Sequence, residues 1–257
     1  MKLARIATDD GPVAGRYEDG VLHADDGAYD VGADPDFLPP CDPAALYRID
    51  GDVAGADEQS AREHVDALDF VAEPAASLVG HRAPVPAPDP ADELAADKLV
   101  AVGEFAAVID ERCRNVSEDA VPEIVRGYAI RNDVVAVDRS GHPVRNAVDG
   151  PVGLGPWIET AVDPTGVGVR FDVTGERRRE ATTESMPFDP VEIVSSLSRR
   201  VSLRSGDVVS LGSPAAPESV EAGDAVETTY EGVGTLRNTV VDSSEPEGRD
   251  EREALRA

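Results

Sequence analysis

The residues from 100 to 138 constrain the fold of this chain more than any other stretch. They read as an apolar strand, a turn, a short helix and a second apolar strand, with Glu104 embedded in the first strand and Asp133 in the second. A carboxylate between apolar neighbours is costly to bury unless it is ion-paired, hydrogen-bonded or bound to a cation. We therefore expect a site here, built either on a divalent cation or on backbone amides or an arginine such as Arg126 or Arg131.

The hydrophobic pattern divides the chain into four segments. Short strands surround a hairpin turn at Glu18–Gly20, whereas the proline-rich run 83–90 is typical of an extended connector. The last residues are too polar to support a packed core. We expect a small N-terminal β domain, a lid-like and proline-rich connector, a large β domain and a disordered tail, at residues 1–45, 46–98, 99–242 and 243–257.

Individual elements can be expected from local signals. Ser117 followed by two acids predicts a helix that Gly127 ends, and Asp189-Pro190 with Glu192 predicts a second, capped helix. Residues 57–68 have the pattern of a polar helix. Strands are predicted at 2–7, 13–17, 21–24, 208–211, 225–230 and 235–241.

The charge balance excludes several partners. Aspartate and glutamate total 51 against 24 lysines and arginines, which gives a net charge of -27, and Lys2 and Lys98 are the only lysines. Nucleic acid and anionic membranes require a basic surface, so neither is expected as a partner. The acidic residues are spread along the whole chain rather than gathered in a tail, so we expect a salt-adapted cytoplasmic protein. No signal peptide is visible, and no apolar run approaches the ~20 residues of a membrane span.

Other reactive residues lack the spacing of a functional site. Cys41 and Cys113 are too few for a disulfide framework and are expected to be reduced thiols. No Gly-rich, lysine-bearing phosphate loop is present. The histidines stand apart from one another and are expected to be structural or exposed: His23, His64, His81 and His142.

Five blocks of sequence together resemble the fumarylacetoacetate hydrolase family. In order they are GEFAAVIDERCRNVSEDAVPEIVRGYAIRNDV, LGPWIET, TESMPFDPVEIVSSLSRR, LRSGDVVSLGSPA and EAGDAVETTYEGVGTLRNTVV. The resemblance implies an α+β, mainly β fold, in which a mixed β-sandwich roll follows a small N-terminal β domain. It also implies a homodimer and a metal-dependent hydrolase or lyase acting on 2-oxo or β-diketo acids, with Mg²⁺ or Mn²⁺ as the cofactor.

The resemblance places metal ligands on the two strands of the opening motif. The family has a Glu-x-Glu pair, which here reads Val102-Gly103-Glu104, and an Asn-Asp segment in which Asp133 matches the ligand. Glu104 and Asp133 are therefore the candidate metal ligands, and Asp149 is a weaker candidate for a replacement oxygen. Valine supplies no oxygen, so the ligand set is one carboxylate short.

Further positions that the family uses for chemistry are replaced in this chain. Arg145 stands beside the position of a substrate-binding lysine and is a candidate replacement, and Ser213 matches a position near the substrate, where hydrogen bonding is expected rather than nucleophilic attack. The replacements are Ala56 and Gln59 for a His/Glu pair, Glu73 for lysine, Val137 for arginine and Asn146 for lysine.

These losses leave three hypotheses. The first is a family member whose activity on oxo or diketo acids is weak, altered or lost, because the base that activates water and the cations that hold the substrate are missing. The second is a non-catalytic, dimeric binding or assembly protein. The third is a working enzyme with a changed mechanism, in which Glu104, Asp133 and Asp149 surround a metal and Arg145 holds a small oxo acid.

Overall fold

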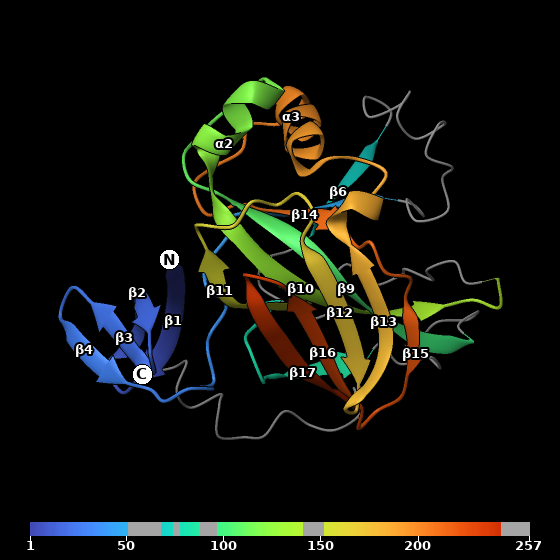
Figure 1. Cartoon of the computed structure of the whole chain (residues 1–257), viewed down its shortest axis with the longest axis horizontal. Coiled ribbons are helices and arrows are strands. Elements are labelled where there is room, and N and C mark those ends of the chain that lie inside the picture. Colours follow the sequence, from blue (N-terminus) through green and yellow to red (C-terminus); the bar gives the residue numbers. More distant parts are fainter. Residues whose placement is uncertain (51–67, 74–77, 88–96, 141–151, 243–257) are drawn as a thin grey trace.

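The computed structural model describes residues 1–50, 68–73, 78–87, 97–140 and 152–242, and within them the chain is mainly β, as predicted. A larger and a smaller mixed β-sheet make up the fold, with short helices above them in the view of Figure 1. The larger sheet pairs in the order β4 (Gly27–Asp30), β3 (Val21–Ala24), β2 (Gly11–Glu18), β1 (Lys2–Thr8), β11 (Val152–Glu159), β10 (Val125–Val137), β9 (Lys98–Ile109), β14 (Val208–Gly212), β5 (Leu46–Asp50) and β6 (Asp69–Glu73).

Two further strands pair with the larger sheet, and five strands make up the smaller one. β7 (Leu78–Val79) pairs with β11, and β15 (Glu218–Val220) pairs with β9. The smaller sheet pairs in the order β13 (Glu176–Thr182), β12 (Gly168–Val173), β16 (Ala225–Tyr230), β17 (Gly234–Asp242) and β8 (Pro84–Ala87).

The N-terminal strands form the β unit that the sequence predicts. Glu18 pairs with Val21 across a two-residue turn, in which Asp19 has a φ of 49° and Gly20 a φ of 85°. Positive φ at both positions matches the right-handed twist of a hairpin, and Asp-Gly is a favoured pair there. β1 then pairs with β11, so the sheet runs without a break from the N-terminal unit into the large roll.

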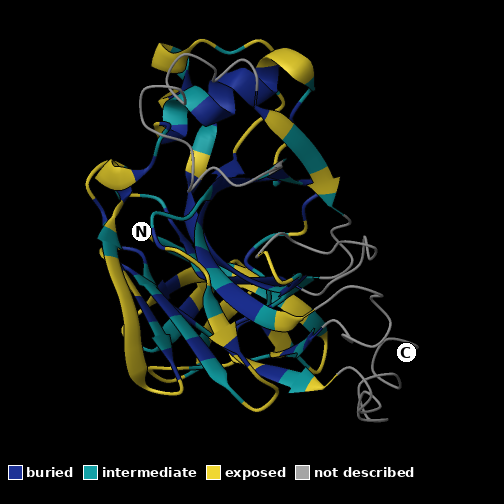
Figure 2. Cartoon of the chain, turned by 90° about the vertical axis from the view of Figure 1, so that its right-hand side faces the viewer, coloured by how far each residue is buried: buried dark blue, intermediate teal, exposed yellow. Residues whose placement is uncertain are grey.

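The core lies between the two sheets. Phe105 on β9 stacks on Tyr230 of β16 at 4.8 Å and on Tyr128 of β10 at 5.0 Å between ring centroids. Figure 2 shows buried residues running through the strands of the roll, with exposed residues on its periphery. Burial of these large side chains is the main favourable term that holds the sheets together.

The second predicted helix is confirmed. α3 (Pro190–Arg200) begins with a capping box, in which the Asp189 carboxylate accepts the N–H of Val191 and the Glu192 carboxylate accepts the N–H of Asp189. Ile193, Val194 and Leu197 are each 1 % exposed and form its buried face.

Two expectations were wrong in extent. The helix predicted to end at Gly127 consists of η4 (Glu118–Ala120) and α2 (Val121–Ile124), because β10 already begins at Val125 and its long ladder with β9 takes over. Part of the predicted connector is β8, which pairs in parallel with β17. The short turn η5 (Thr183–Ser185) precedes α3, and the polar helix predicted at 57–68 falls almost wholly outside the described residues.

Candidate functional site

The β9–β10 ladder brings the predicted carboxylates onto one face of the larger sheet. Glu104 lies directly opposite Arg131, and Val102 lies directly opposite Asp133. Cross-strand neighbours project to the same side, and residues two apart on one strand do so as well. Both predicted carboxylates and the arginine between them are therefore adjacent.

Arg131 is the centre of this group. Its side chain is 0 % exposed, and Nη1 donates to Oε2 of Glu104. Nη2 lies 2.8 Å from Oε2 of Glu73, on β6, and 3.2 Å from Oδ2 of Asp133. Burial acts to lower the pKa of Arg131, but the charges of Asp133, Glu104 and Glu73 outweigh burial and raise that pKa above its ordinary value. The guanidinium is thus a permanent cation among three carboxylates.

Two more side chains hold the carboxylates in place. Ser210 on β14 donates its hydroxyl to Oε2 of Glu104 at 2.8 Å. Arg48 on β5, which is 8 % exposed, donates Nε–H to Oε1 of Glu73 at 2.6 Å. Charge-assisted hydrogen bonds of this kind are stronger than neutral ones. The five charged residues Arg48, Glu73, Glu104, Arg131 and Asp133 are hereafter the ion-pair network.

The donor set does not fit the divalent metal that the resemblance implies. Magnesium and manganese need several oxygens free to point at one ion. Here Glu104, Asp133 and Glu73 each turn an oxygen toward Arg131, and Val102 supplies none. Across the part of the chain that the structure describes, no group of three or more His, Cys, Asp or Glu residues is arranged to hold a metal ion.

The structure decides between the two arginines named as partners. Arg126 is 40 % exposed and pairs with Asp110 at 2.7 Å, away from the network.

Asn132, which the resemblance places beside a metal ligand, points to the opposite face of the sheet. There its amide donates to Asn238 at 3.0 Å and accepts the hydroxyl of Thr228 at 2.6 Å.

The remaining candidates are placed as follows. The Ser213 hydroxyl accepts the N–H of Ala215 at 3.1 Å and contacts the hydroxyl of Tyr230, which is the contact of a turn residue rather than of an activated nucleophile. Arg145, Asp149, Ala56 and Gln59 lie outside the described residues.

Sequence reasoning missed Glu73 and Arg48 as members of this group. Glu73 was noted only as the residue that replaces the family's lysine, although the change from a positive to a negative charge at that position was itself a signal. Arg48 carried no signal, because its contact with Glu73 depends on the pairing of β5 with β6.

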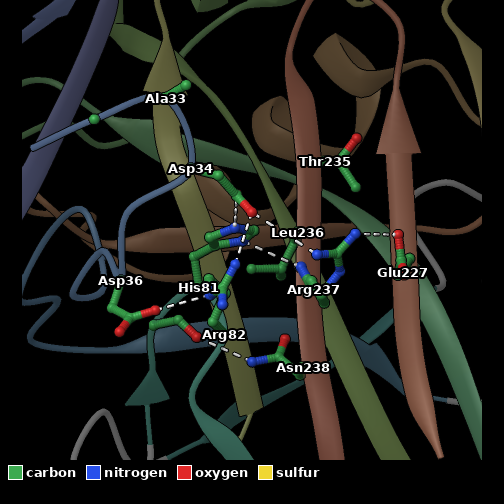
Figure 3. Close-up of polar contacts among 12 residues, drawn as sticks. Ala33, Asp34, Asp36, His81, Arg82, Glu227, Thr235, Leu236, Arg237 and Asn238 are labelled. Atoms are coloured by element: carbon green, nitrogen blue, oxygen red, sulfur yellow. Dashed lines mark hydrogen bonds and ion pairs between the residues drawn. The ribbon is translucent and has the colours of Figure 1, made fainter. Parts of the chain in front are cut away.

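A second polar cluster joins the N-terminal unit to the roll (Figure 3). Asp34 accepts hydrogen bonds from His81 Nε2 at 3.0 Å and from Arg82 Nη1 at 2.7 Å. His81 Nδ1 accepts the N–H of Arg237, so both ring nitrogens are engaged. Burial lowers the pKa of His81 below its ordinary value, although Asp34 opposes that shift. His81 is therefore a structural histidine, as expected.

A cavity of about 420 Å³ adjoins this cluster. Its wall includes Phe37, His81 and Trp157, and the ammonium of Lys2 lies 4.1 Å from the centroid of the Trp157 ring. The Trp157 N–H donates to Val233 O at 2.6 Å. These polar groups already contact other residues of the protein, so we assign no catalytic function to the cavity.

Together the fold and the network define a class: a two-sheet β roll with an N-terminal β unit and a carboxylate group on β9 and β10. The sequence profile of the fumarylacetoacetate (FAA) hydrolase C-terminal domain matches residues 48–241. This chain belongs to the fumarylacetoacetate hydrolase family.

Known relatives agree with this assignment. The chain is 31 % identical over 246 residues to an uncharacterized protein of Archaeoglobus fulgidus, covering 93 % of this chain and 96 % of that one. It is similar to the structure of 5-carboxymethyl-2-hydroxymuconate delta-isomerase from Mycobacterium smegmatis, with a TM-score of 0.78, 28 % identity and coverage of 95 % and 100 %.

A third comparison is with a solved structure of similar fold. It is maleylpyruvate hydrolase from Sphingobium sp. SYK-6 in complex with manganese(II) and pyruvate, with a TM-score of 0.73, 22 % identity and coverage of 94 % and 99 %. That likeness is one of fold. In the ranges described above, no helix of our chain combines the length and the apolar character required to cross a membrane.

Proposed function

We propose that this chain is a family member without divalent-metal-dependent turnover, and that it acts as a non-catalytic, homodimeric protein. One observation carries the proposal: Arg131, fully buried, holds the carboxylates of Glu104 and Asp133. A metal in such a site would act as a Lewis acid and as the partner of an oxo acid's oxygens. With the arginine in place, the same carboxylates are neutralised from within the chain.

The charges of the network also disfavour an anionic substrate. An oxo acid needs a cation that is not already paired, yet Arg48 and Arg131 both pair with acids of the network. Two guanidinium groups face three carboxylates, so the network is acidic overall, inside a chain of net charge -27. Binding of a further anion there is opposed by like-charge repulsion.

Support for the dimer comes from the family resemblance. A binding or assembly role requires only that the scaffold and its interface persist, and the described strands retain the family fold over the whole length of the roll. The molar mass in solution, measured by light scattering after gel filtration in molar KCl, tests this part separately. A monomer at micromolar concentration would contradict it.

Thermal unfolding tests the loss of metal chemistry. The wild type is heated in molar KCl with and without Mn²⁺ or Mg²⁺, and then with oxalate, a bidentate mimic of an oxo acid. A ligand present at about 100 times its dissociation constant would add about 2.7 kcal/mol to the free energy of unfolding. We expect no saturable shift and no turnover of oxo acids or of 5-carboxymethyl-2-hydroxymuconate.

The control variant is Glu104→Gln, which keeps the volume of the side chain and removes its charge. A saturable rise in the wild-type midpoint that Glu104→Gln abolishes would overturn the proposal, because it would show that the carboxylates remain open to metal. Metal-dependent turnover by the wild type would overturn it equally.

A further inference from the structure

The cavity between the N-terminal β unit and the roll contains an ammonium group without a counter-ion. Lys2 lies on β1, and its Nζ is 4.1 Å from the ring centroid of Trp157 and 5.8 Å from that of Tyr17. Within the described residues, Lys2 forms no ion pair. Its cross-strand neighbour Glu159 is engaged elsewhere, because that carboxylate accepts a hydrogen bond from the amino group of Met1. The ammonium is therefore available to an anion that enters the cavity.

Aromatic rings surround this ammonium. Trp157 stacks on Tyr17 at 5.5 Å between ring centroids, and Phe37 meets Trp157 edge-on at 5.8 Å. The Trp157 ring is fixed in place, since its N–H donates to Val233 O at 2.6 Å and a Cβ at Gly234 would come within 2.7 Å of it. A ring that is already held still can bind a planar ligand without losing side-chain freedom.

Another part of the wall limits the charge that a ligand can carry. Asp34 lines the cavity and turns its carboxylate toward His81 and Arg82 (Figure 3). His81 adds no second positive charge at neutral pH, because burial lowers its pKa. A dianion would therefore meet one ammonium and one carboxylate, whereas a monoanion is neutralised by Lys2 alone. The cavity thus favours a single negative charge.

We infer that this cavity is a binding site for a small aromatic monocarboxylate, whose carboxylate pairs with Lys2 and whose ring lies against Trp157 and Phe37. Its volume of about 420 Å³ falls within the range of small-molecule pockets, which is about 300–1,000 Å³. The inference goes beyond the proposed function and does not rest on it, because the cavity shares no residue with the ion-pair network.

Tryptophan fluorescence reports on this cavity selectively, because Trp157 is the only tryptophan of the chain. Benzoate is titrated into the full chain in molar KCl, with a chelator present so that no divalent cation contributes to carboxylate binding. We expect a saturable change in the emission of Trp157 and a saturable rise in the melting temperature. Benzamide has the same ring without the charge, and it should bind at least about tenfold more weakly than benzoate.

The two lysines of the chain provide a matched pair of variants. Lys2→Gln removes the ammonium and should weaken benzoate binding at least about tenfold, while the weak binding of benzamide stays as in the wild type. Lys98→Gln removes the only other lysine, at an exposed position of β9, and should leave both affinities unchanged. Equal benzoate affinity in the two variants would overturn the pairing of the carboxylate with Lys2.

A second variant keeps the test decisive if Lys2→Gln does not fold. Ala33→Phe adds a ring at an exposed position of the cavity wall and should fill part of the space, while the Ala33 carbonyl that accepts the Tyr17 hydroxyl is kept. We expect it to abolish the fluorescence response to benzoate.

Two results would overturn the inference: a wild type whose emission and melting temperature do not respond to benzoate, or a response that survives Ala33→Phe unchanged. Either result would leave the proposed function standing, because that function is tested separately by the response to Mn²⁺ and oxalate and by turnover.

Discussion

Arg131 and Glu104 face each other across the β9–β10 ladder, and their side chains form a salt bridge within one chain. A carboxylate that the family resemblance assigns to a metal thus finds its counter-charge on the neighbouring strand. The pair is mostly shielded from water, since Arg131 is 0 % and Glu104 is 16 % exposed at the side chain. Removal of this salt bridge should therefore change the free energy of unfolding as well as ligand binding.

Arg131→Leu should lower the free energy of unfolding by about 3–5 kcal/mol when divalent cations are chelated, because it leaves buried carboxylates without their cation. Urea unfolding in molar KCl measures the change. Arg126→Leu is the matched control, and removal of this exposed ion pair should cost about 0–1 kcal/mol. Equal costs for the two variants would contradict the buried character of the network.

Ser210→Ala should lower the free energy of unfolding by about 1–3 kcal/mol, because the hydroxyl donates to the charged Glu104 carboxylate in a site with little water. Ser185→Ala serves as the control, since this serine is exposed and its hydroxyl donates to the carbonyl of Thr182, three residues earlier. A Ser210 variant as stable as the wild type would show that the hydrogen bond is replaced by solvent.

Asn132→Leu should also destabilise the fold, by about 1–3 kcal/mol for each buried polar group left without a partner. The side chain accepts from Thr228 and donates to Asn238, and these two residues lie on the opposing sheet. Thr239→Ala, at an exposed position of the same sheet, is the control. Chemical denaturation that gave equal midpoints for both variants would argue against a structural role for this cross-link.

Acidification should weaken the His81 cluster. The pKa of His81 is lowered in the folded chain, by burial first and by Arg237 and Arg82 in addition, against the opposing effect of Asp34. The unfolded state therefore binds a proton more readily once the pH falls below about 6.5, and stability decreases with the pH in that window. The pKa of Asp34 is lowered too, chiefly by its hydrogen bond with His81, so a further loss is expected below its ordinary value of 3.8.

Urea unfolding between pH 7.5 and 5 measures the contribution of His81. His81→Gln should flatten the decline of the unfolding free energy, whereas His23→Gln, at an exposed strand position, should leave it unchanged. An identical pH dependence in wild type and His81→Gln would refute the assignment.

Salt should stabilise the chain. With a net charge of -27, repulsion among carboxylates opposes the compact state, and raising the salt from 0.1 to 1 M shortens the Debye length from about 10 to about 3 Å. The melting temperature should therefore rise with KCl, followed by circular dichroism. A flat or falling response would show that surface repulsion has little weight in this fold.

Much of the site could be predicted from the sequence, and the alternation of side chains along β10 explains which residues were predictable. Arg131 and Asp133 are two residues apart and so share a face, while Asn132 between them must point to the other sheet. That parity alone favours Arg131 as the partner of the carboxylates. By contrast, Glu73 and Arg48 reach the network through strands that are distant in the sequence, and no local pattern reports such pairing.

The fold was predictable where local signals were strong. The Asp19-Gly20 hairpin and the capping box at Asp189 both appear as expected, because turn and cap chemistry depend on neighbouring residues. β8 was missed because its prolines argue against a strand. Prolines are tolerated in an edge strand, and β8 lies at the edge of the sheet, where it pairs only with β17 among the described strands.

The two edges of the smaller sheet are protected from strand addition in different ways. Among the described strands, one edge is β8, where Pro84 and Pro86 lack backbone donors, and the other is β13, which carries three arginines and two glutamates. Concentrated salt screens the side chains of β13, but it cannot restore an N–H that proline does not have. In concentrated salt, strand addition at β8 therefore remains blocked by its prolines. Among the described strands of this sheet, polymerisation could then begin only at the β13 edge.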